Sequence, residues 1–194
     1  MNDTQESQND GDLDFTQHFS PETPVPEPRH TPEQLRDIDD LGSIGAAALK
    51  DSGFYARIIN ASQRSSPASP QDTTILIVED DPGTSTIIRR ALEKYQYQTR
   101  QAHDRQSFAT ALRQASLPDL ILLDVMLPGM NGFDILNRIR QHKLLENVPV
   151  IMLTSLSERR DIAKGLSLCA DAYLTKPILP STLIDAVQVV LGGG

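Results

Sequence analysis

The stretch LPDLILLDVMLPGMNGFDIL, residues 117–136, decides the fold of this chain. It opens with a continuous apolar run that ends at Asp124, which is typical of a buried strand. Apolar residues at helical spacing, among them Ile135 and Ile139, then follow from Asn131, which predicts an amphipathic helix. A buried strand that leads into such a helix is the unit from which parallel α/β sheets are built.

The same strand-then-helix unit occurs five times from residue 73 onward. The predicted strands are 74–78, 97–102, 120–123, 148–153 and 172–175. Fully apolar strands belong in the centre of a sheet that helices cover on both faces, so the polar second strand and the short fifth strand are expected at its edges. This predicts an α/β fold with a doubly wound, five-stranded parallel sheet in the flavodoxin-like order 2-1-3-4-5. The ends of the first and third strands then meet at the crevice where such folds bind ligands.

Carboxylates gather at this crevice. Glu79 and Asp80 follow the first strand, and Asp124 ends the third. Because like charges at one site repel each other, a hard divalent cation such as Mg²⁺, with its preference for oxygen ligands, is the expected solution. Asp81 is interpreted differently, as the N-cap of the helix that begins at Pro82.

Two further polar residues end the later strands. Thr154 follows the fourth strand and Lys176 follows the fifth, so the predicted strand order brings both to the same crevice. A lysine offers a point positive charge to a phosphoryl oxygen, and a hydroxyl offers a short hydrogen bond. Each residue alone is unremarkable. The combination of acid pair, Asp, Thr and Lys at the ends of strands one, three, four and five is specific.

Four strings of the chain resemble the receiver domain of two-component response regulators. They are ILIVEDDP (75–82), LPDLILLDVMLPGMNGFDIL (117–136), VPVIMLTS (148–155) and DAYLTKPI (171–178). The resemblance covers about 120 residues, all of the chain beyond residue 72. One departure is small: the acid pair is Glu79-Asp80 where many members of the family have two aspartates.

The resemblance implies a role for each of these residues. Asp124 would accept a phosphoryl group from a histidine kinase or a histidine phosphotransfer protein, in a reaction that depends on Mg²⁺ or Mn²⁺. The metal ligands would be Glu79, Asp80, Asp124 and the main-chain carbonyl of Met126. Lys176, followed by a cis peptide bond to Pro177, would bind the phosphoryl group, and Thr154 and Tyr173 would act as switch residues. Apolar side chains at Met126 and Leu156 would make autodephosphorylation slow.

The N-terminal third has a different composition. Residues 1–72 contain thirteen acidic and five basic residues, a net charge of −8, whereas residues 73–194 contain thirteen of each. Residues 1–30 are acidic and proline-rich, which predicts disorder. Residues 31–61 predict an amphipathic helix with a capping box at Thr31, although its glycines weaken it. A Ser/Pro-rich linker over 62–72 precedes the receiver domain at 73–191.

How the signal leaves the domain is open at this stage. Only three glycines follow residue 191, which predicts a stand-alone receiver without a C-terminal output domain. Either the receiver itself docks on a partner protein, or the segment 31–61 is an effector that the receiver regulates. A phosphatase of the haloacid dehalogenase type is a remote alternative, because it too uses an Asp at a strand end, but it expects DxD on the first strand. The chain is otherwise expected to be a signalling module and not an enzyme.

Composition narrows the classes of partner. The acidic tail and the neutral remainder argue against direct nucleic-acid binding, which needs clustered Lys or Arg. No apolar run approaches the length of a membrane span, and the N-terminus lacks the pattern of a signal peptide, so a cytoplasmic protein is expected. The single cysteine, Cys169, excludes an internal disulfide.

Overall fold

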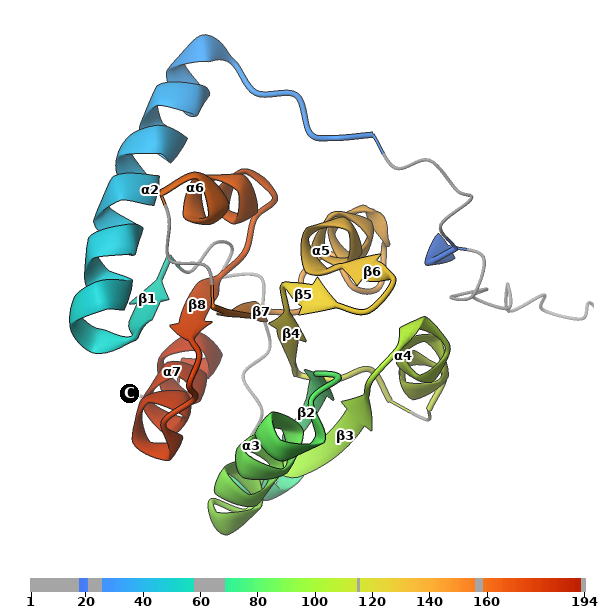
Figure 1. The fold of residues 1–194 in the computed structure, drawn as a ribbon. Helices are drawn as coiled ribbons and strands as arrows, with labels where there is room; N and C mark the ends of the chain where they lie inside the picture. Colours follow the sequence, from blue (N-terminus) through green and yellow to red (C-terminus); the bar gives the residue numbers. More distant parts are fainter. Residues whose placement is uncertain (1–17, 21–25, 58–68, 115, 156–158, 193–194) are drawn as a thin grey trace, which may run out of the picture.

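The computed structural model describes residues 18–20, 26–57, 69–114, 116–155 and 159–192. Its helices and strands alternate along most of the chain (Figure 1). The helices are α2 (Pro32–Ser52), α3 (Pro82–Lys94), α4 (Arg105–Leu112), α5 (Gly132–Gln141), α6 (Arg159–Ser167) and α7 (Pro180–Leu191), with a 3-10 turn, η2, at Pro70–Asp72. The strands are β1 (Phe54–Ala56), β2 (Thr74–Val78), β3 (Gln98–Ala102), β4 (Leu120–Asp124), β5 (Met126–Leu127), β6 (Met130–Asn131), β7 (Val150–Thr154) and β8 (Ala172–Thr175).

The central sheet has the order β1-β8-β7-β4-β2-β3. Its five strands other than β1 are parallel to one another. Over residues 73–191 this confirms the predicted order 2-1-3-4-5, with the polar β3 at one edge. One expectation was wrong: β8 is not an edge strand, because β1 pairs with it antiparallel on its outer side. Three of the four residues of β8 are accordingly buried.

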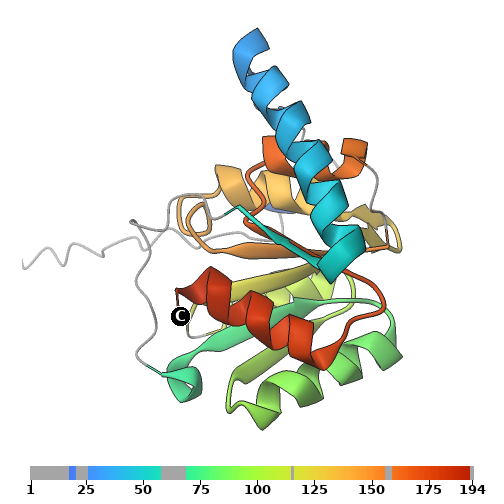
Figure 2. The same ribbon diagram turned by 90° about the vertical axis from the view of Figure 1, so that its left-hand side faces the viewer.

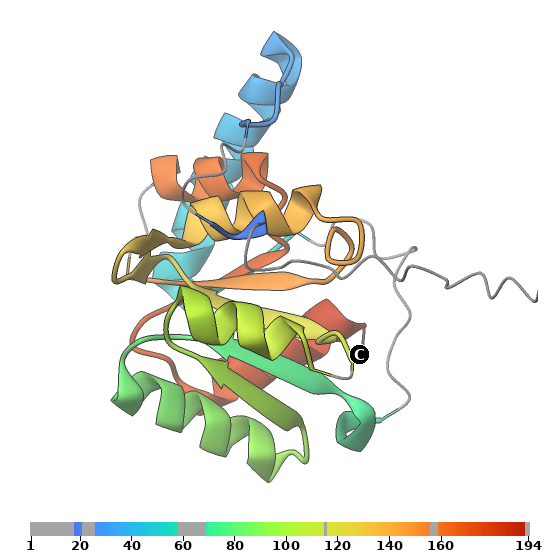
Figure 3. The ribbon, with the colours of Figure 1, turned by 90° about the vertical axis from the view of Figure 1, so that its right-hand side faces the viewer.

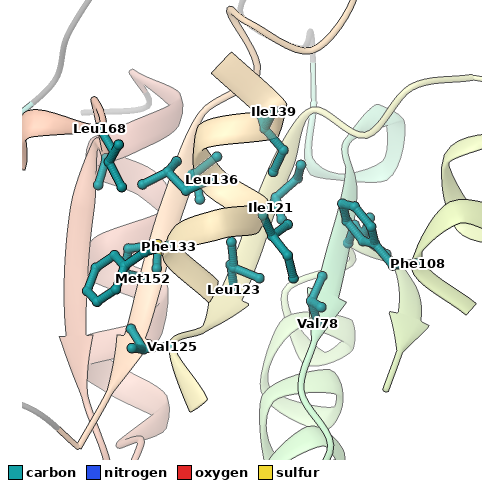
Figure 4. Packing of buried hydrophobic residues seen from close by; sticks show 14 of the residues in the cluster. Val78, Phe108, Ile121, Leu123, Val125, Phe133, Leu136, Ile139, Met152 and Leu168 are labelled. Carbon is teal, nitrogen blue, oxygen red and sulfur yellow. The ribbon is translucent and has the colours of Figure 1, made fainter. Parts of the chain in front are cut away.

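Helices cover both faces of the sheet (Figures 2 and 3). One face packs against α4, α5 and α6, and the other packs against α3 and α7. Alternate residues of each strand enter the two cores, as Val78, Ile121 and Leu123 do on the first face, where they meet Phe108 of α4 and Leu136 of α5 (Figure 4). The central strands β2, β4 and β7 are buried along their whole length, as their apolar sequences require.

The N-terminal helix α2 is shorter than the predicted segment 31–61. It begins with the expected capping box, in which Thr31 N–H donates to Gln34 Oε1 (2.9 Å) and Gln34 N–H donates to Thr31 Oγ1 (3.2 Å). It ends at Gly53, whose left-handed backbone (φ +74°) turns the chain into β1. Residues 54–56 are therefore a strand and not part of the helix, and residues 58–61 lie outside the described part of the chain.

Part of the segment predicted to be disordered, residues 1–30, is packed on α4 and α5. Phe19 is buried and its ring contacts Phe108 of α4 edge-to-face, with centroids 4.9 Å apart. His18 Nε2 lies 2.8 Å from the Arg138 carbonyl of α5, and Arg138 Nη1 donates to the His18 carbonyl (2.6 Å). The burial of one large aromatic side chain, Phe19, offsets the entropy lost when this segment becomes ordered. The polar composition of residues 1–30 does not reveal this contribution. Figure 3 shows this short segment beside α5.

No helix within the described ranges is long and apolar enough to cross a membrane.

Candidate functional site

Three carboxylates meet at the C-terminal end of the sheet. Glu79 and Asp80 follow β2, and Asp124 ends β4, the neighbouring strand, in which Leu123 stands opposite Val78. Each carboxylate offers an oxygen within 4.8 Å of the others. Glu79 and Asp124 are buried, whereas Asp80 is half-buried. The sequence prediction that these side chains converge is therefore met by the structure.

Lys176 reaches the same point from the end of β8. Its Nζ donates hydrogen bonds to Asp124 Oδ2 (2.7 Å) and to Glu79 Oε1 (2.9 Å). The Lys176–Pro177 peptide bond is cis, as the resemblance implied. Burial by itself lowers the pKa of Lys176, but the hydrogen bonds to Asp124 and Glu79 outweigh it, so this pKa is raised and the ammonium stays charged.

The net charge of this site favours the binding of a divalent cation. Three carboxylates and one ammonium have formal charges that leave an excess of two negative charges. Glu79 Oε2 lies 2.7 Å from Lys176 Nζ, but it is buried and accepts no hydrogen bond within the described part of the chain. Burial and the nearby Asp124 carboxylate raise the pKa of Glu79, although Lys176 opposes them. Oxygen ligands with this excess charge fit Mg²⁺ or Mn²⁺.

The loop after β4 orients the Asp124 carboxylate. Met126 N–H donates to Asp124 Oδ1 (3.0 Å), which leaves Oδ2 to Lys176. Gly132 N–H closes this loop on the Val125 carbonyl (2.9 Å). A Cβ at position 132 would overlap the Asp124 carbonyl, so only glycine allows this close approach. Sequence reasoning missed Gly132, for which the GMNG string after Asp124 was the available signal. The Met126 carbonyl as a metal ligand stays a prediction.

The two predicted switch residues lie on neighbouring strands. Thr154 ends β7, is buried, and stands opposite Thr175 in the sheet, one residue before Lys176. Tyr173 is buried beneath α6, where its hydroxyl donates to the Ile162 carbonyl (3.2 Å). Burial raises the pKa of Tyr173 well above its ordinary value, so the hydroxyl remains a donor.

Tyr173 also depends on a glycine that sequence reasoning missed. A Cβ at Gly165 of α6 would overlap the Tyr173 hydroxyl, so the ring fits only beneath a helix that carries glycine there.

Two other sequence predictions have different outcomes. Asp81 is the N-cap of α3, as expected, since its Oδ1 accepts from Thr84 N–H (2.6 Å), and this hydrogen bond lowers its pKa. Leu156, expected to influence dephosphorylation, lies outside the described residues.

The chain resembles known proteins over the part that contains this site. The sequence profile of the response regulator receiver domain matches residues 75–188. The phosphate regulon transcriptional regulatory protein PhoB of Pseudomonas aeruginosa is 40% identical over 118 residues, which are 61% of this chain and 51% of that protein. The DNA-binding dual master transcriptional regulator RpaA of Synechocystis is 38% identical over 120 residues, which are 60% of this chain and 48% of that protein. The chain thus spans about half the length of these curated relatives.

Solved structures agree with this assignment of the fold. A putative response regulator from Chloroflexus aurantiacus matches with a TM-score of 0.58 at 32% identity, over 62% of this chain and 98% of that one. The chemotaxis response regulator CheY4 of Vibrio cholerae matches with a TM-score of 0.56 at 28% identity, over 61% of this chain and 98% of that one.

Proposed function

Because this chain belongs to the response regulator receiver family, we propose that it acts in phosphorelay signalling with Asp124 as the phosphoacceptor. The observation that carries this proposal is the position of Lys176, which joins Asp124 and Glu79 from the far side of the crevice. A carboxylate beside an ammonium and an acid pair has the nucleophile and the positive charge that phosphoryl transfer requires. The family match also favours this function over the phosphatase alternative.

The reaction is the transfer of a phosphoryl group from a phosphohistidine to Asp124. A carboxylate oxygen attacks the phosphorus, the bond from phosphorus to the imidazole nitrogen breaks, and an acyl phosphate forms. Met126 N–H fixes the orientation of the carboxylate, and Lys176 stabilises negative charge on the phosphoryl oxygens. Thr154, buried at the end of β7, offers its hydroxyl to the same group.

Glu79, Asp80 and Asp124 would hold the divalent cation, together with the Met126 carbonyl. When bound, Mg²⁺ or Mn²⁺ neutralises charge on the phosphoryl oxygens. With an apolar side chain at Met126, which is exposed beside Asp124, and another at Leu156, we expect slow autodephosphorylation. Neither side chain can orient a hydrolytic water, so a phosphoryl lifetime of seconds would contradict this expectation.

The phosphodonor is a histidine kinase or a histidine phosphotransfer protein, and the output is a change in a protein-binding surface and not an enzymatic reaction or direct contact with nucleic acid. The alternative, in which residues 31–61 are an effector regulated by the receiver, gains support from the packing of α2 on α6. Acyl phosphate formation adds charge beside Thr154 and Lys176, and it biases the protein between two arrangements of these residues.

Phosphorylation by acetyl phosphate tests the proposal. In Mg²⁺, the full chain should gain the mass of one phosphoryl group, and Asp124→Asn should gain none. Asp185→Asn is the matched control, because Asp185 is exposed on α7, and it should be labelled like the original protein. Labelling that persists in Asp124→Asn would show that the acceptor is a different residue.

A further inference from the structure

A short segment that precedes α2 is held on α4 and α5 by few contacts. It comprises residues 18–20 and 26–30, here called the strap (Figure 3). Of these residues Phe19 alone is buried, and its ring meets that of Phe108 edge-to-face. The Pro26 carbonyl accepts from Asn137 Nδ2 (3.2 Å) and Gln141 Nε2 (2.8 Å) of α5. Because one ring and a few hydrogen bonds hold the strap against its conformational entropy, a small change in free energy can release it.

His18 joins the strap to α5 beside this ring. Its Nε2 donates to the Arg138 carbonyl (2.8 Å), since a carbonyl can only accept, and Arg138 Nη1 donates to the His18 carbonyl (2.6 Å). The His18 imidazole also meets that of His142 edge-to-face, with centroids 4.9 Å apart. Histidine is the side chain whose charge ordinarily changes between pH 5 and 8, so a contact between two histidines is a place where pH can act.

The hydrogen bonding of His142 requires its neutral form. Its Nδ1 accepts from Leu144 N–H (3.3 Å), so the proton of the neutral ring is on Nε2. A second proton, on Nδ1, would remove this acceptor. His142 is only 9% exposed. Burial and the neighbouring His18 lower the pKa of His142.

The helices supply mainly positive charge around this pair of histidines. Arg138 of α5 is buried, Arg105 at the start of α4 is half-buried, and Asp134 of α5 is exposed. These three side chains interact: burial and Arg105 lower the pKa of Arg138, whereas Asp134 raises it. An imidazolium at this place would therefore add a positive charge beside a buried guanidinium.

The remaining charged groups are near water. Lys143 and Glu146, which follow His142 in the chain, are exposed, as are Glu27 and Arg29 of the strap. His30, the other titratable residue of the strap, is half-buried. Since the carboxylates among these groups are exposed, solvent screens them, and they offset a buried positive charge only weakly.

We propose that the strap is a pH-sensitive element, which is docked on α4 and α5 while His18 and His142 are neutral and is released when this pair takes up a proton. Release separates Phe19 from Phe108 and the His18 carbonyl from Arg138. It thus uncovers an aromatic and a basic group on the surface of α4 and α5. The proposal is independent of the function proposed for Asp124.

Release takes place as the pH falls. Docking brings His18 against His142, and the burial of this ring and His18 itself both lower its pKa. A group whose pKa is lower in the docked state favours docking above its ordinary pKa, about 6.5 for histidine. This contribution is lost as the pH falls through the lowered value. Each proton that only the released state binds reduces the docking equilibrium constant by up to about tenfold per pH unit.

Aromatic NMR of the full chain, without phosphodonor or metal, tests the proposal. The nuclear Overhauser effect between the rings of Phe19 and Phe108, whose centroids lie 4.9 Å apart, reports docking. Circular dichroism reports whether the sheet stays folded. We expect the Overhauser effect to be present at about pH 7.5 and lost at about pH 5.5, with the sheet intact at both.

Replacing the two histidines removes the proposed switch. His18→Gln with His142→Gln is neutral at both pH values. Glutamine retains a donor for the Arg138 carbonyl and an acceptor for Leu144 N–H. This double variant should stay docked in acid, so the Overhauser effect should persist there.

The matched control replaces the other two histidines of the chain. His30→Gln with His103→Gln should release the strap in acid as the original chain does. Burial also raises the pKa of Glu79, but this residue is present in all three chains. It therefore cannot account for a difference between them.

A second measurement holds even if the His18→Gln, His142→Gln variant does not dock at neutral pH. If a proton on His142 opposes docking, then docking must lower the pKa of His142. Titration of the His142 ring by NMR should therefore give a higher pKa in Phe19→Ala than in the original chain. A shift of the Phe108 ring signals confirms that Phe19→Ala has released the strap.

Three results would overturn the proposal. One is an Overhauser effect between Phe19 and Phe108 that persists in the original chain in acid. Another is its loss in acid from a His18→Gln, His142→Gln variant that is docked at neutral pH. The third is an equal pKa of His142 in the original chain and in Phe19→Ala, which would show that docking and protonation are not linked.

Discussion

Replacing Lys176 with methionine tests whether one ammonium holds the acidic cluster together. Lys176 Nζ donates to Asp124 Oδ2 (2.7 Å) and Glu79 Oε1 (2.9 Å), and only 20% of its side chain is exposed. Methionine preserves the apolar stem but leaves two buried carboxylates without a counter-ion. Hydrogen bonds to charged groups contribute about 1.5–3 kcal/mol each, and breaking a buried pair costs about 3–5 kcal/mol.

We expect Lys176→Met to lose about 3 kcal/mol of unfolding free energy near pH 7 in the absence of divalent cations, at the lower end of that range because Asp80 is only half-buried beside the site. Urea denaturation monitored by circular dichroism measures the loss. Lys94→Met is the matched control, since Lys94 is exposed at the end of α3, and it should change stability by less than about 0.5 kcal/mol.

The loss should also depend on pH. Burial and Asp124 already raise the pKa of Glu79, and removal of the ammonium raises it further. A group whose pKa is higher in the folded state than in the unfolded state stabilises the fold below its unfolded pKa, and this stabilisation disappears as the pH rises through the folded pKa. The difference between Lys176→Met and the original protein should therefore shrink on acidification from about pH 7 toward the carboxyl range. A loss below about 0.5 kcal/mol at neutral pH, or one that grows in acid, would refute this account of the site.

Three other predictions follow, one from the same site and two from contacts elsewhere in the fold. Lys176→Met should bind Mg²⁺ more tightly than the original protein in isothermal titration calorimetry, because it removes a competing positive charge; weaker binding would show that the cation binds elsewhere. Gly165→Ala should destabilise the fold by roughly 1–3 kcal/mol because its Cβ overlaps the Tyr173 hydroxyl. Tyr173→Phe should recover part of that loss, and additive effects in this double-mutant cycle would contradict the contact. Phe19→Ala should remove about 1.5–3 kcal/mol of the burial energy that holds the segment around residue 19 on the domain. Protease cleavage near residue 19 should then become faster while the sheet stays folded. Unchanged cleavage would argue against the docking of Phe19.

Sequence periodicity was sufficient for the receiver fold because each central strand is an unbroken apolar run. Residues 120–123 and 150–153 are fully buried, and their parallel pairing places Asp124 and Thr154 together at the C-terminal end of the sheet. The parallel order then requires Lys176 to arrive from the neighbouring strand. The convergence of the site was therefore predictable from topology. The two hydrogen bonds of Lys176 were not, because they depend on the rotamer of a long side chain.

The features that sequence reasoning missed are those that depend on contacts between distant segments. Gly42 and Gly45 are unfavourable within an isolated helix, which is why the sequence of residues 31–61 predicted a helix of low stability. In the structure they are the positions where α2 touches α6, so the same residues that weaken the helix locally allow it to dock.

The strand β1 could not be predicted for a related reason. Three residues, Phe54–Ala56, are too few to show a periodicity, and they form a strand because they pair with the outer edge of β8. This pairing explains why β8 is buried although it is short and was expected at the side of the sheet. A short terminal strand in a chain of this family is thus evidence about the surface on which it docks.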